Sequence, residues 1–479
     1  MFQESKNRRL QYAHPLLPSV TLLKLMSTLK MRRHHCKFLN LLSITLYILC
    51  YTELGLGNDD DVPENTMENQ GIYNSLNVTE IPETLKPLLT EVYFIQTGIT
   101  NIRAGAFRNN LNLTKIHFVS NPINSVDVRA FEGLSIITDI AISGSHLTFL
   151  PVGVFSDTKN LKILSLKSNQ LQRLDKGLFD GLTNLTHLQL HTNNLTQLPE
   201  GLFDDLEHLT LLSLAKNRIR TISRELFNKL AKLKKLRLYE NELEDLPDGL
   251  FKDMPGLTEI LLHSNRIRAL PAHSFSYNNM LEKIQLEKNS LTELPHGIFF
   301  HLPNLKTLML HSNQLVQLPS ALFGQMPKLT ELRLNQNNLS ALPPGIFNNL
   351  TSLKKLFLSN NKLTGLHTES FTGLPQLTEL YLQENNLKSL SSEIFKGIPK
   401  LKILNLANNH LTTVPADLFN SLSQVNRIFI EGNPWSCECN LIGLLTWIQN
   451  RKFSSPATCE SPFILQGNLL TSITADQFI

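Results

Sequence analysis

A frame of 24 residues recurs through most of this chain. Phenylalanine stands at Phe107 and at every 24th position after it up to Phe419, fourteen times without a gap. Asparagine keeps the same period at twelve successive positions, which are Asn169, Asn193, Asn217, Asn241, Asn265, Asn289, Asn313, Asn337, Asn361, Asn385, Asn409 and Asn433. A fixed period in this range is the mark of a stacked array in which each unit packs only on its neighbours. The chain is therefore expected to stack units rather than to divide into ordinary globular domains.

The unit around Asn193 shows what each recurring residue does. Leu188 and Leu190 alternate with polar residues, as in a short strand with one buried face. Asn193 follows where the chain leaves the strand, and we call this the ladder position. Its amide can hydrogen-bond backbone groups of its own and the adjoining unit that would otherwise be buried without partners. Phe203 returns to the core from the convex side, so the phenylalanines predict a continuous aromatic column.

These features predict an α/β solenoid of about 14 units of 24 residues, from the unit of Thr97 to that of Asn409. Its concave side is a parallel β-sheet, its convex side is mostly irregular or short 3-10 structure, and a cap with a helix closes the C-terminal end. Thr97 and Ser145 replace the ladder Asn, and a hydroxyl can make only part of the amide's hydrogen bonds.

The beginning of the chain has the order of a secretory signal. A basic segment from Met31 to Lys37 precedes 14 apolar residues, Phe38 to Tyr51. This run is shorter than the roughly 20 residues of a transmembrane helix, and an uncleaved membrane anchor is the alternative. Because a signal does not normally begin so late, Met26 or Met31 is the expected true start.

Four segments are therefore expected. They are a leader with signal peptide at 1–57, an N-terminal cap at 58–87, the repeat array at 88–432 and a C-terminal cap at 433–479. No transmembrane span is expected in the mature, secreted chain.

Charge excludes some classes of partner. Residues 1–57 hold eight Lys and Arg against two acidic residues, a balance of +6, so the remainder has 37 basic and 39 acidic residues, a balance of −2. The nearly neutral remainder favours neither nucleic acid nor an anionic membrane as a partner.

Six N-x-S/T tripeptides agree with export and predict glycosylation. They begin at Asn77, Asn112, Asn184, Asn194, Asn338 and Asn349. Asn194 and Asn338 directly follow a ladder Asn, where their side chains are expected to face outward.

The end of the chain leaves the repeat frame. Asn440 is expected to cap a helix in which Leu441, Leu444, Leu445 and Ile448 recur at helical spacing. Cys437, Cys439 and Cys459 also lie here, and an odd count leaves one thiol outside a disulfide.

Three outward positions in each strand line the concave face, at six, four and two residues before the ladder residue. We call them the outer, middle and inner columns. In mid-array the outer column alternates in charge, which predicts pairing between neighbouring strands. The middle column runs Arg237, Leu261, Gln285, Met309, Arg333, Phe357, Tyr381, Asn405 and Phe429. Exposed apolar groups around an arginine are typical of contact surfaces. Met309, Arg333, Phe357, Tyr381 and Phe429 are therefore the candidate partner-binding residues, unless the aromatic rings only stack on one another.

Catalysis, cofactors and metals are not expected. The chain has no H-E-x-x-H, G-x-S-x-G, Walker or G-x-G-x-x-G motif. In the inner column His263 and His311 stand two strands apart, too far for one zinc without a ligand between them. No small-molecule substrate is expected.

The returns of the form L-P-x-G-[LI]-F and the ending Asn433-Pro-Trp-Ser-Cys-Glu-Cys439 resemble extracellular leucine-rich repeat proteins with a cysteine-containing C-terminal cap. The resemblance implies a horseshoe of stacked repeats. Within that family, Glu91–Thr97, Ala106-Phe107, Asn112–Lys115 and Ile142–His146 resemble the regulatory, non-catalytic subunits of carboxypeptidase N.

This resemblance implies a secreted glycoprotein that binds and stabilises a catalytic carboxypeptidase and catalyses nothing itself. It also implies that Cys437 pairs with Cys459, and Cys439 with a later cysteine that this chain does not contain, so the cap is expected to be incomplete. The chain departs from the family in having no cysteine in residues 58–90.

The sequence thus predicts a secreted protein-binding scaffold, in its specific form an enzyme-regulating subunit that holds its partner on the concave face. The alternatives are a cell-surface or matrix protein of recognition or adhesion, and an innate-immune protein that binds ligands. Because this fold serves many functions, only the face distinguishes them.

Overall fold

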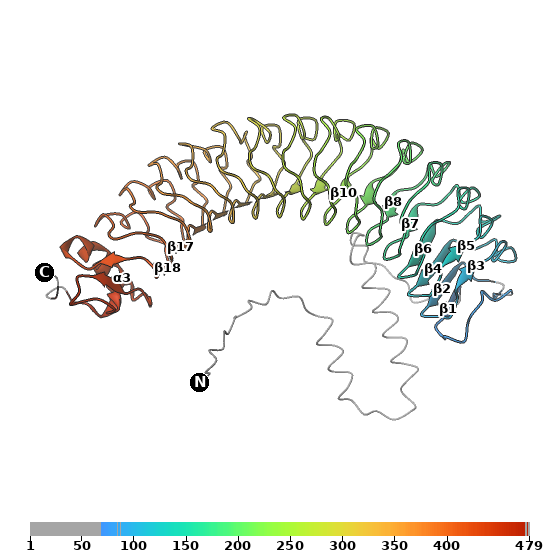
Figure 1. The fold of residues 1–479 in the computed structure, drawn as a ribbon, viewed down its shortest axis with the longest axis horizontal. Helices are drawn as coiled ribbons and strands as arrows, with labels where there is room; N and C mark the ends of the chain where they lie inside the picture. Colours follow the sequence, from blue (N-terminus) through green and yellow to red (C-terminus); the bar gives the residue numbers. More distant parts are fainter. Residues whose placement is uncertain (1–68, 84, 87, 475–476, 478–479) are drawn as a thin grey trace, which may run out of the picture. The chain divides into compact units, whose positions relative to one another are not determined.

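The computed structural model describes residues 69–83, 85–86, 88–474 and 477, which all belong to one compact unit. The expected leader, with Met26 and Met31, and the first part of the expected N-terminal cap lie outside the described residues. Within this unit, the strands lie along the inner side of a curved array of stacked turns (Figure 1). The predicted solenoid is confirmed.

A single parallel sheet of sixteen strands runs through the unit in chain order. Its strands are β1 (Gln70–Tyr73), β2 (Glu91–Ile95), β4 (Lys115–Val119), β6 (Asp139–Ser143), β7 (Ile163–Ser165), β8 (His187–Gln189), β9 (Leu211–Ser213), β10 (Lys235–Arg237), β11 (Glu259–Leu261), β12 (Lys283–Gln285), β13 (Thr307–Met309), β14 (Glu331–Arg333), β15 (Lys355–Phe357), β16 (Glu379–Tyr381), β17 (Ile403–Asn405) and β18 (Arg427–Phe429). The fourteen predicted units correspond to β2 through β17, and β1 and β18 add one strand at either end.

The 24-residue frame did not predict β1, because β1 lies fewer than 24 residues before β2. Gln70 pairs with Glu91, 21 residues later, whereas Glu91 pairs with Lys115 and Lys115 with Asp139, each 24 residues later. The chain therefore begins its sheet within the segment expected to be a cap.

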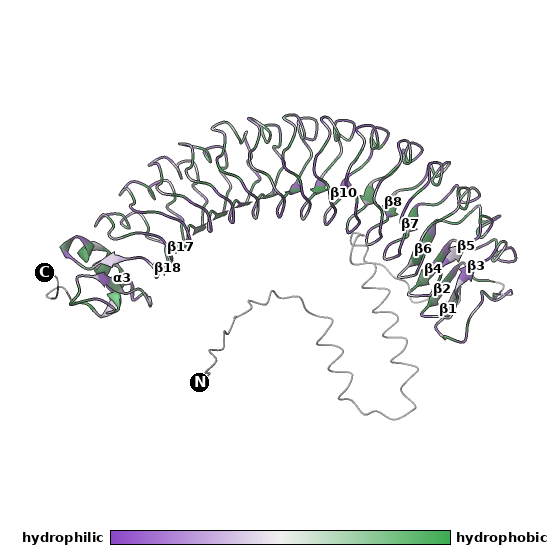
Figure 2. Cartoon of the chain, viewed as in Figure 1, coloured by the Kyte–Doolittle hydropathy of each residue, from purple (hydrophilic) through white to green (hydrophobic). Residues whose placement is uncertain are grey.

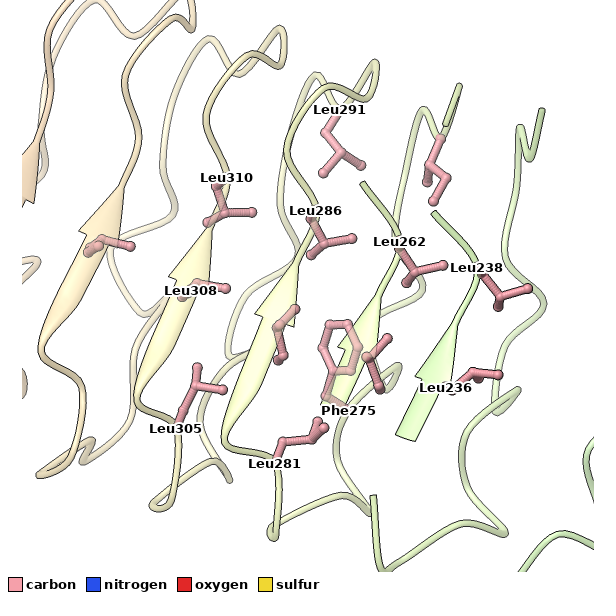
Figure 3. Packing of buried hydrophobic residues seen from close by; sticks show 14 of the residues in the cluster. Leu236, Leu238, Leu262, Phe275, Leu281, Leu286, Leu291, Leu305, Leu308 and Leu310 are labelled. Atoms are coloured by element: carbon pink, nitrogen blue, oxygen red, sulfur yellow. The ribbon is translucent and has the colours of Figure 1, made fainter. Parts of the chain in front are cut away.

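The core lies between this sheet and the convex turns. Leu236, Leu238 and Leu262 point inward from their strands toward Phe275, which enters from the convex side (Figure 3). Neighbouring phenylalanine rings stack along the array, with centroids 6.1 Å apart for Phe107 and Phe131 and 6.0 Å apart for Phe251 and Phe275. Burial of each ring contributes about 2–3 kcal/mol. The predicted aromatic column is present as three runs of ring contacts, Phe107 to Phe155, Phe179 to Phe227 and Phe251 to Phe347, rather than as one continuous stack. Hydropathy alternates along each turn as the buried and exposed positions require (Figure 2).

The ladder asparagines join successive units. Asn193 donates from Nδ2 to the Leu166 carbonyl of the preceding unit and the Leu190 carbonyl of its own, both at 3.0 Å. Its Oδ1 accepts from the Leu171 N–H, also at 3.0 Å. The predicted role of these amides is confirmed.

Ser145 interrupts this ladder. Its Oγ and the Oδ1 of Asn169 in the next unit are buried and make no hydrogen bond with the described residues. Both junctions therefore keep an unsatisfied buried oxygen, and the serine makes fewer hydrogen bonds than a ladder asparagine does.

The convex side of the array consists of turns. Two short strands, β3 (Asn101–Ile102) and β5 (Ser125–Val126), pair in parallel there, and Phe299 bridges Phe323. The expected short 3-10 segments are not found among the described residues of the convex side. In the described part of the chain, 3-10 helices occur only in the C-terminal cap.

The C-terminal cap contains η1 (Cys439–Leu441), α3 (Ile442–Arg451), η2 (Leu470–Ser472) and the paired strands β19 (Trp435–Ser436) and β20 (Cys459–Ser461). The prediction that Asn440 caps the helix was wrong. A 3-10 turn, closed by the Leu441 N–H on the Glu438 carbonyl at 2.9 Å, contains Asn440 and moves the start of α3 to Ile442. The helix buries Leu444, Leu445 and Ile448 as expected.

Candidate functional site

Three residues of the middle column form one continuous stack on the concave face. The Phe357 and Tyr381 rings lie parallel, with centroids 4.6 Å apart and planes 2° apart. The Arg333 guanidinium lies over the Phe357 ring, 4.6 Å from its centroid. All three side chains are half-buried, because each covers part of its neighbour. The stack thus spans β14, β15 and β16.

Carboxylates of the outer column hold the two ends of this stack. Glu331 pairs with Arg333 within β14. Glu379 accepts from the Tyr381 hydroxyl at 3.0 Å and also pairs with Lys355 at 3.0 Å. Burial, with this hydrogen bond to Glu379, raises the pKa of Tyr381 to about 12. The tyrosine therefore stays protonated and its ring is fixed at neutral pH.

The other two candidates lie at either side of the stack. Met309 is in register with Arg333 on the neighbouring strand β13. Phe429 is separated from Tyr381 by Asn405 and is 37% exposed. The structure therefore brings Met309 next to the stack, whereas Phe429 stands apart on the last strand.

Pairing in the outer column is more varied than its alternating charges predicted. Lys355 and Glu379 pair between neighbouring strands as expected. Glu259, however, pairs with Arg237 of the middle column at 3.0 Å. A long arginine side chain can reach the carboxylate diagonally, and the expected pair with Lys235 is not formed.

A second polar network, near the N-terminal end of the face, was missed from the sequence. Tyr93 donates to Glu91 at 2.7 Å, and Lys115 pairs with the same carboxylate at 3.2 Å. His117 contacts Asp139 at 3.0 Å and packs edge-on against the Tyr93 ring. The same column positions, read from β2 onward, would have revealed it. Its members satisfy one another, so it is a closed network.

The inner column carries half-buried histidines. Burial, followed by the nearby Lys167, Arg237 and Lys216, lowers the pKa of His191 to about 4. Burial, followed by Arg333, Lys288 and His263 and opposed by Glu331, lowers the pKa of His311 to about 4. Both imidazoles are therefore neutral at physiological pH.

The lowered pKa values of His191 and His311 predict that the folded protein loses stability in acid. An unfolded histidine has a pKa near 6.5, so between about pH 6.5 and pH 4 the unfolded chain binds protons that the folded chain refuses. The free energy of unfolding should fall as the pH drops through this window, by about 1–2 kcal/mol per histidine after a discount for solvent screening of the partly exposed rings. These groups should cause no further loss below it. Melting temperatures from pH 7.5 to pH 4 measure the effect. The double variant His191→Gln/His311→Gln should show a clearly shallower dependence, whereas exposed His296→Gln should match the wild type. An unchanged slope in the double variant would contradict the assignment.

Cys437 and Cys459 form a disulfide with Cα atoms 5.7 Å apart, as the resemblance implied. Cys439 is exposed and lies outside this bond. Among the described residues, no three His, Cys, Asp or Glu side chains converge as a metal site. In the same part of the chain, no helix has the length and hydropathy of a membrane span.

The predicted glycosylation sites differ in their surroundings. Asn77, Asn112 and Asn184 are exposed, whereas Asn194 and Asn338 are half-buried rather than fully outward-facing. Asn184 and Asn349 each donate from Nδ2, the atom that would carry the glycan, to a backbone carbonyl, that of Lys159 at 3.1 Å and that of Phe323 at 3.0 Å. None of the six lies in a concave column.

Comparison with known families agrees with this architecture. A family model described as leucine rich repeat matches residues 137–195, 183–243, 231–290, 279–339, 327–387 and 375–434. These matches run without a break over more than half of the chain. The chain therefore belongs to the leucine-rich repeat family. No curated protein matches it significantly.

Several solved structures share the fold. A leucine-rich repeat protein of Leptospira interrogans is 26% identical with a TM-score of 0.66, over 82% of this chain and 96% of that one. A chain of the Toll–Spatzle complex of Drosophila is 25% identical with a TM-score of 0.66, over 81% of this chain and 52% of that one. A chain of the TLR13–ssRNA13 complex is 25% identical with a TM-score of 0.68, over 81% and 57%. The protein thus spans just over half the length of the Toll–Spatzle and TLR13 chains.

Proposed function

We propose that the protein is a secreted, non-catalytic scaffold that binds a protein partner on its concave face, centred on Arg333, Phe357 and Tyr381. The proposal rests on the stack of these three side chains. Arginine and tyrosine dominate binding energy at protein interfaces, and the ring packing limits the side-chain entropy that binding would cost. Outer-column carboxylates already fix its geometry.

The surroundings favour protein over nucleic acid. Three basic residues of the face, Arg237, Arg333 and Lys355, are each paired with a carboxylate. Their pairing leaves these three cations little free charge for phosphates, on which nucleic-acid affinity mainly depends. This holds although one structural neighbour was solved with single-stranded RNA.

Export supports an extracellular partner. The leader resembles a secretory signal, the chain contains the Cys437–Cys459 disulfide, and glycans at the six predicted sites would leave the concave columns open. Disulfides persist mainly in oxidising compartments. The Toll–Spatzle neighbour belongs to a complex described as a hub of development and innate immunity. Extracellular recognition is accordingly the second candidate, and a catalytic carboxypeptidase subunit, suggested by sequence resemblance, is the specific partner to test first.

The test is capture of the partner by the secreted chain. Protein purified from the medium is used to isolate bound extracellular proteins, and the complex is assayed for carboxypeptidase activity on basic C-terminal residues. The variant Phe357→Ala/Tyr381→Ala should bind the captured partner at least about tenfold more weakly, since centrally placed aromatic residues carry most of the affinity. Its melting temperature should change little, because both side chains lie outside the core.

Tyr277→Ala is the matched control, because Tyr277 is an aromatic residue of the convex side that is 60% exposed. Unchanged binding by the double variant would refute the concave site. A captured partner without peptidase activity would exclude the carboxypeptidase assignment and leave extracellular recognition.

A further inference from the structure

Four neighbouring units present buried polar atoms without partners at the same position. In the inner column, two residues past the ends of β11 to β14, these atoms are His263 Nδ1, Glu287 Oε2, His311 Nδ1 and Asn335 Oδ1. None makes a hydrogen bond with the described residues. Adjacent strands lie about 4.8 Å apart, so the atoms form a row along the concave face. Buried polar groups are normally satisfied, and such a row calls for a ligand.

Glu287 is the centre of this row. It is only 8% exposed, and its other oxygen, Oε1, lies 4.0 Å from His263 Nδ1. The pKa of Glu287 is raised, because burial outweighs a hydrogen bond with its own backbone and the nearby Lys283, Lys288 and Arg333, which lower it. These cations favour the carboxylate without forming an ion pair with it. Arg333 is held instead by Glu331 and the Phe357 ring.

The row specifies the chemistry of its ligand. A carboxylate and an amide oxygen accept hydrogen bonds, and a neutral imidazole contributes one accepting nitrogen. The Tyr239 ring stacks on His263 at 4.5 Å, which fixes the imidazole next to Glu287. A planar guanidinium offers five N–H donors and packs well on aromatic faces. An anion would be repelled by the carboxylate and would find only hydrogen-bond acceptors. A metal ion would need three converging ligands, which the described residues do not supply.

We propose that Glu287, flanked by His263 and His311, receives an arginine side chain of the protein partner. This inference rests on the proposed concave-face function and names the chemistry of the partner there. The arginine would dock on β11 to β13, beside Met309 and one strand from Arg333. The aromatic stack would hold an adjacent part of the same partner.

The experiment uses Nα-acetyl-arginine amide as the probe and Nα-acetyl-citrulline amide, which lacks the charge, as its control. At millimolar concentrations the arginine probe should raise the melting temperature of the full secreted chain more than the citrulline probe does, because it binds only the folded state. In Glu287→Gln the apparent affinity for the arginine probe should fall at least about tenfold. Glu259→Gln, which removes a paired carboxylate of β11, should keep the wild-type response.

Equal responses to the two probes, or an undiminished response in Glu287→Gln, would overturn the proposal. Without a probe, Glu287→Gln should melt at or above the wild-type temperature, because it removes a buried charge that has no partner. A large decrease would instead assign Glu287 a structural role and overturn the docking site. If Phe357→Ala/Tyr381→Ala loses the partner while Glu287→Gln keeps it, the proposed function stands and this inference fails.

Discussion

Replacing Asn217 by alanine should lower the free energy of unfolding by about 3–5 kcal/mol, although the residue touches no candidate binding residue. The amide is 7% exposed and donates from Nδ2 to the carbonyls of Leu190 and Leu214, both at 3.0 Å. Its Oδ1 accepts from the Leu195 N–H at 3.1 Å. Alanine would leave the Leu195 N–H without a partner, at a cost of about 1–3 kcal/mol, and would remove one of the two amide donors that the Leu190 and Leu214 carbonyls each have.

Chemical denaturation followed by circular dichroism measures this loss. Asn228→Ala is the control, since Asn228 is an exposed residue of the same array and should stay within about 0.5 kcal/mol of the wild type. Because units interact only with neighbours, the damaged junction should also broaden the transition. A variant as stable as the wild type would refute the ladder as a source of stability.

Gly324→Ala should be the second strongly destabilising change, by about 2–4 kcal/mol. A Cβ at Gly324 would lie 2.1 Å from the carbonyl oxygen of Phe300 and 2.7 Å from its Cα. Both atoms belong to the backbone of the preceding unit, so the convex turns would have to move apart. The reason is local crowding on the convex side, near the bridge between Phe299 and Phe323.

The matched substitution is Gly365→Ala, where an added Cβ meets no atom within 4 Å. It should stay within about 1 kcal/mol of the wild type, because replacing a freely accommodated glycine mainly restricts the unfolded chain. Thermal melts of both variants provide the comparison. Equal stability of the two would show that the convex turns yield more easily than this packing indicates.

The repeated frame predicted most of the fold, because the same few residues determine each unit. Alternating leucines predicted the strands, the ladder Asn predicted the hydrogen bonds between units, and the phenylalanines predicted the aromatic column. The frame could not predict β1, whose spacing from β2 is shorter, or the 3-10 turn that contains Asn440. Both lie at an end of the array, where a unit has only one neighbour.

The candidate site was predictable only as a set of columns. Periodicity placed Arg333, Phe357 and Tyr381 on one face. In the structure the two rings stack on one another, which was the alternative interpretation. Whether a half-buried stack also binds a partner depends on that partner, so the assignment stays a prediction. The unsatisfied atoms around Glu287 could not be foreseen, because satisfaction of a polar atom depends on side-chain conformation.

The aromatic column ends on a tryptophan. The Trp447 ring stacks on Phe419 at 4.7 Å, and Trp435 donates from its indole N–H to the Ile430 carbonyl at 3.0 Å. These are the only two tryptophans in the sequence. Intrinsic tryptophan fluorescence is therefore an optical label for the C-terminal cap alone, whereas circular dichroism averages over every unit. Comparing the two signals during unfolding would separate opening of this end from melting of the array without any added dye or mutation.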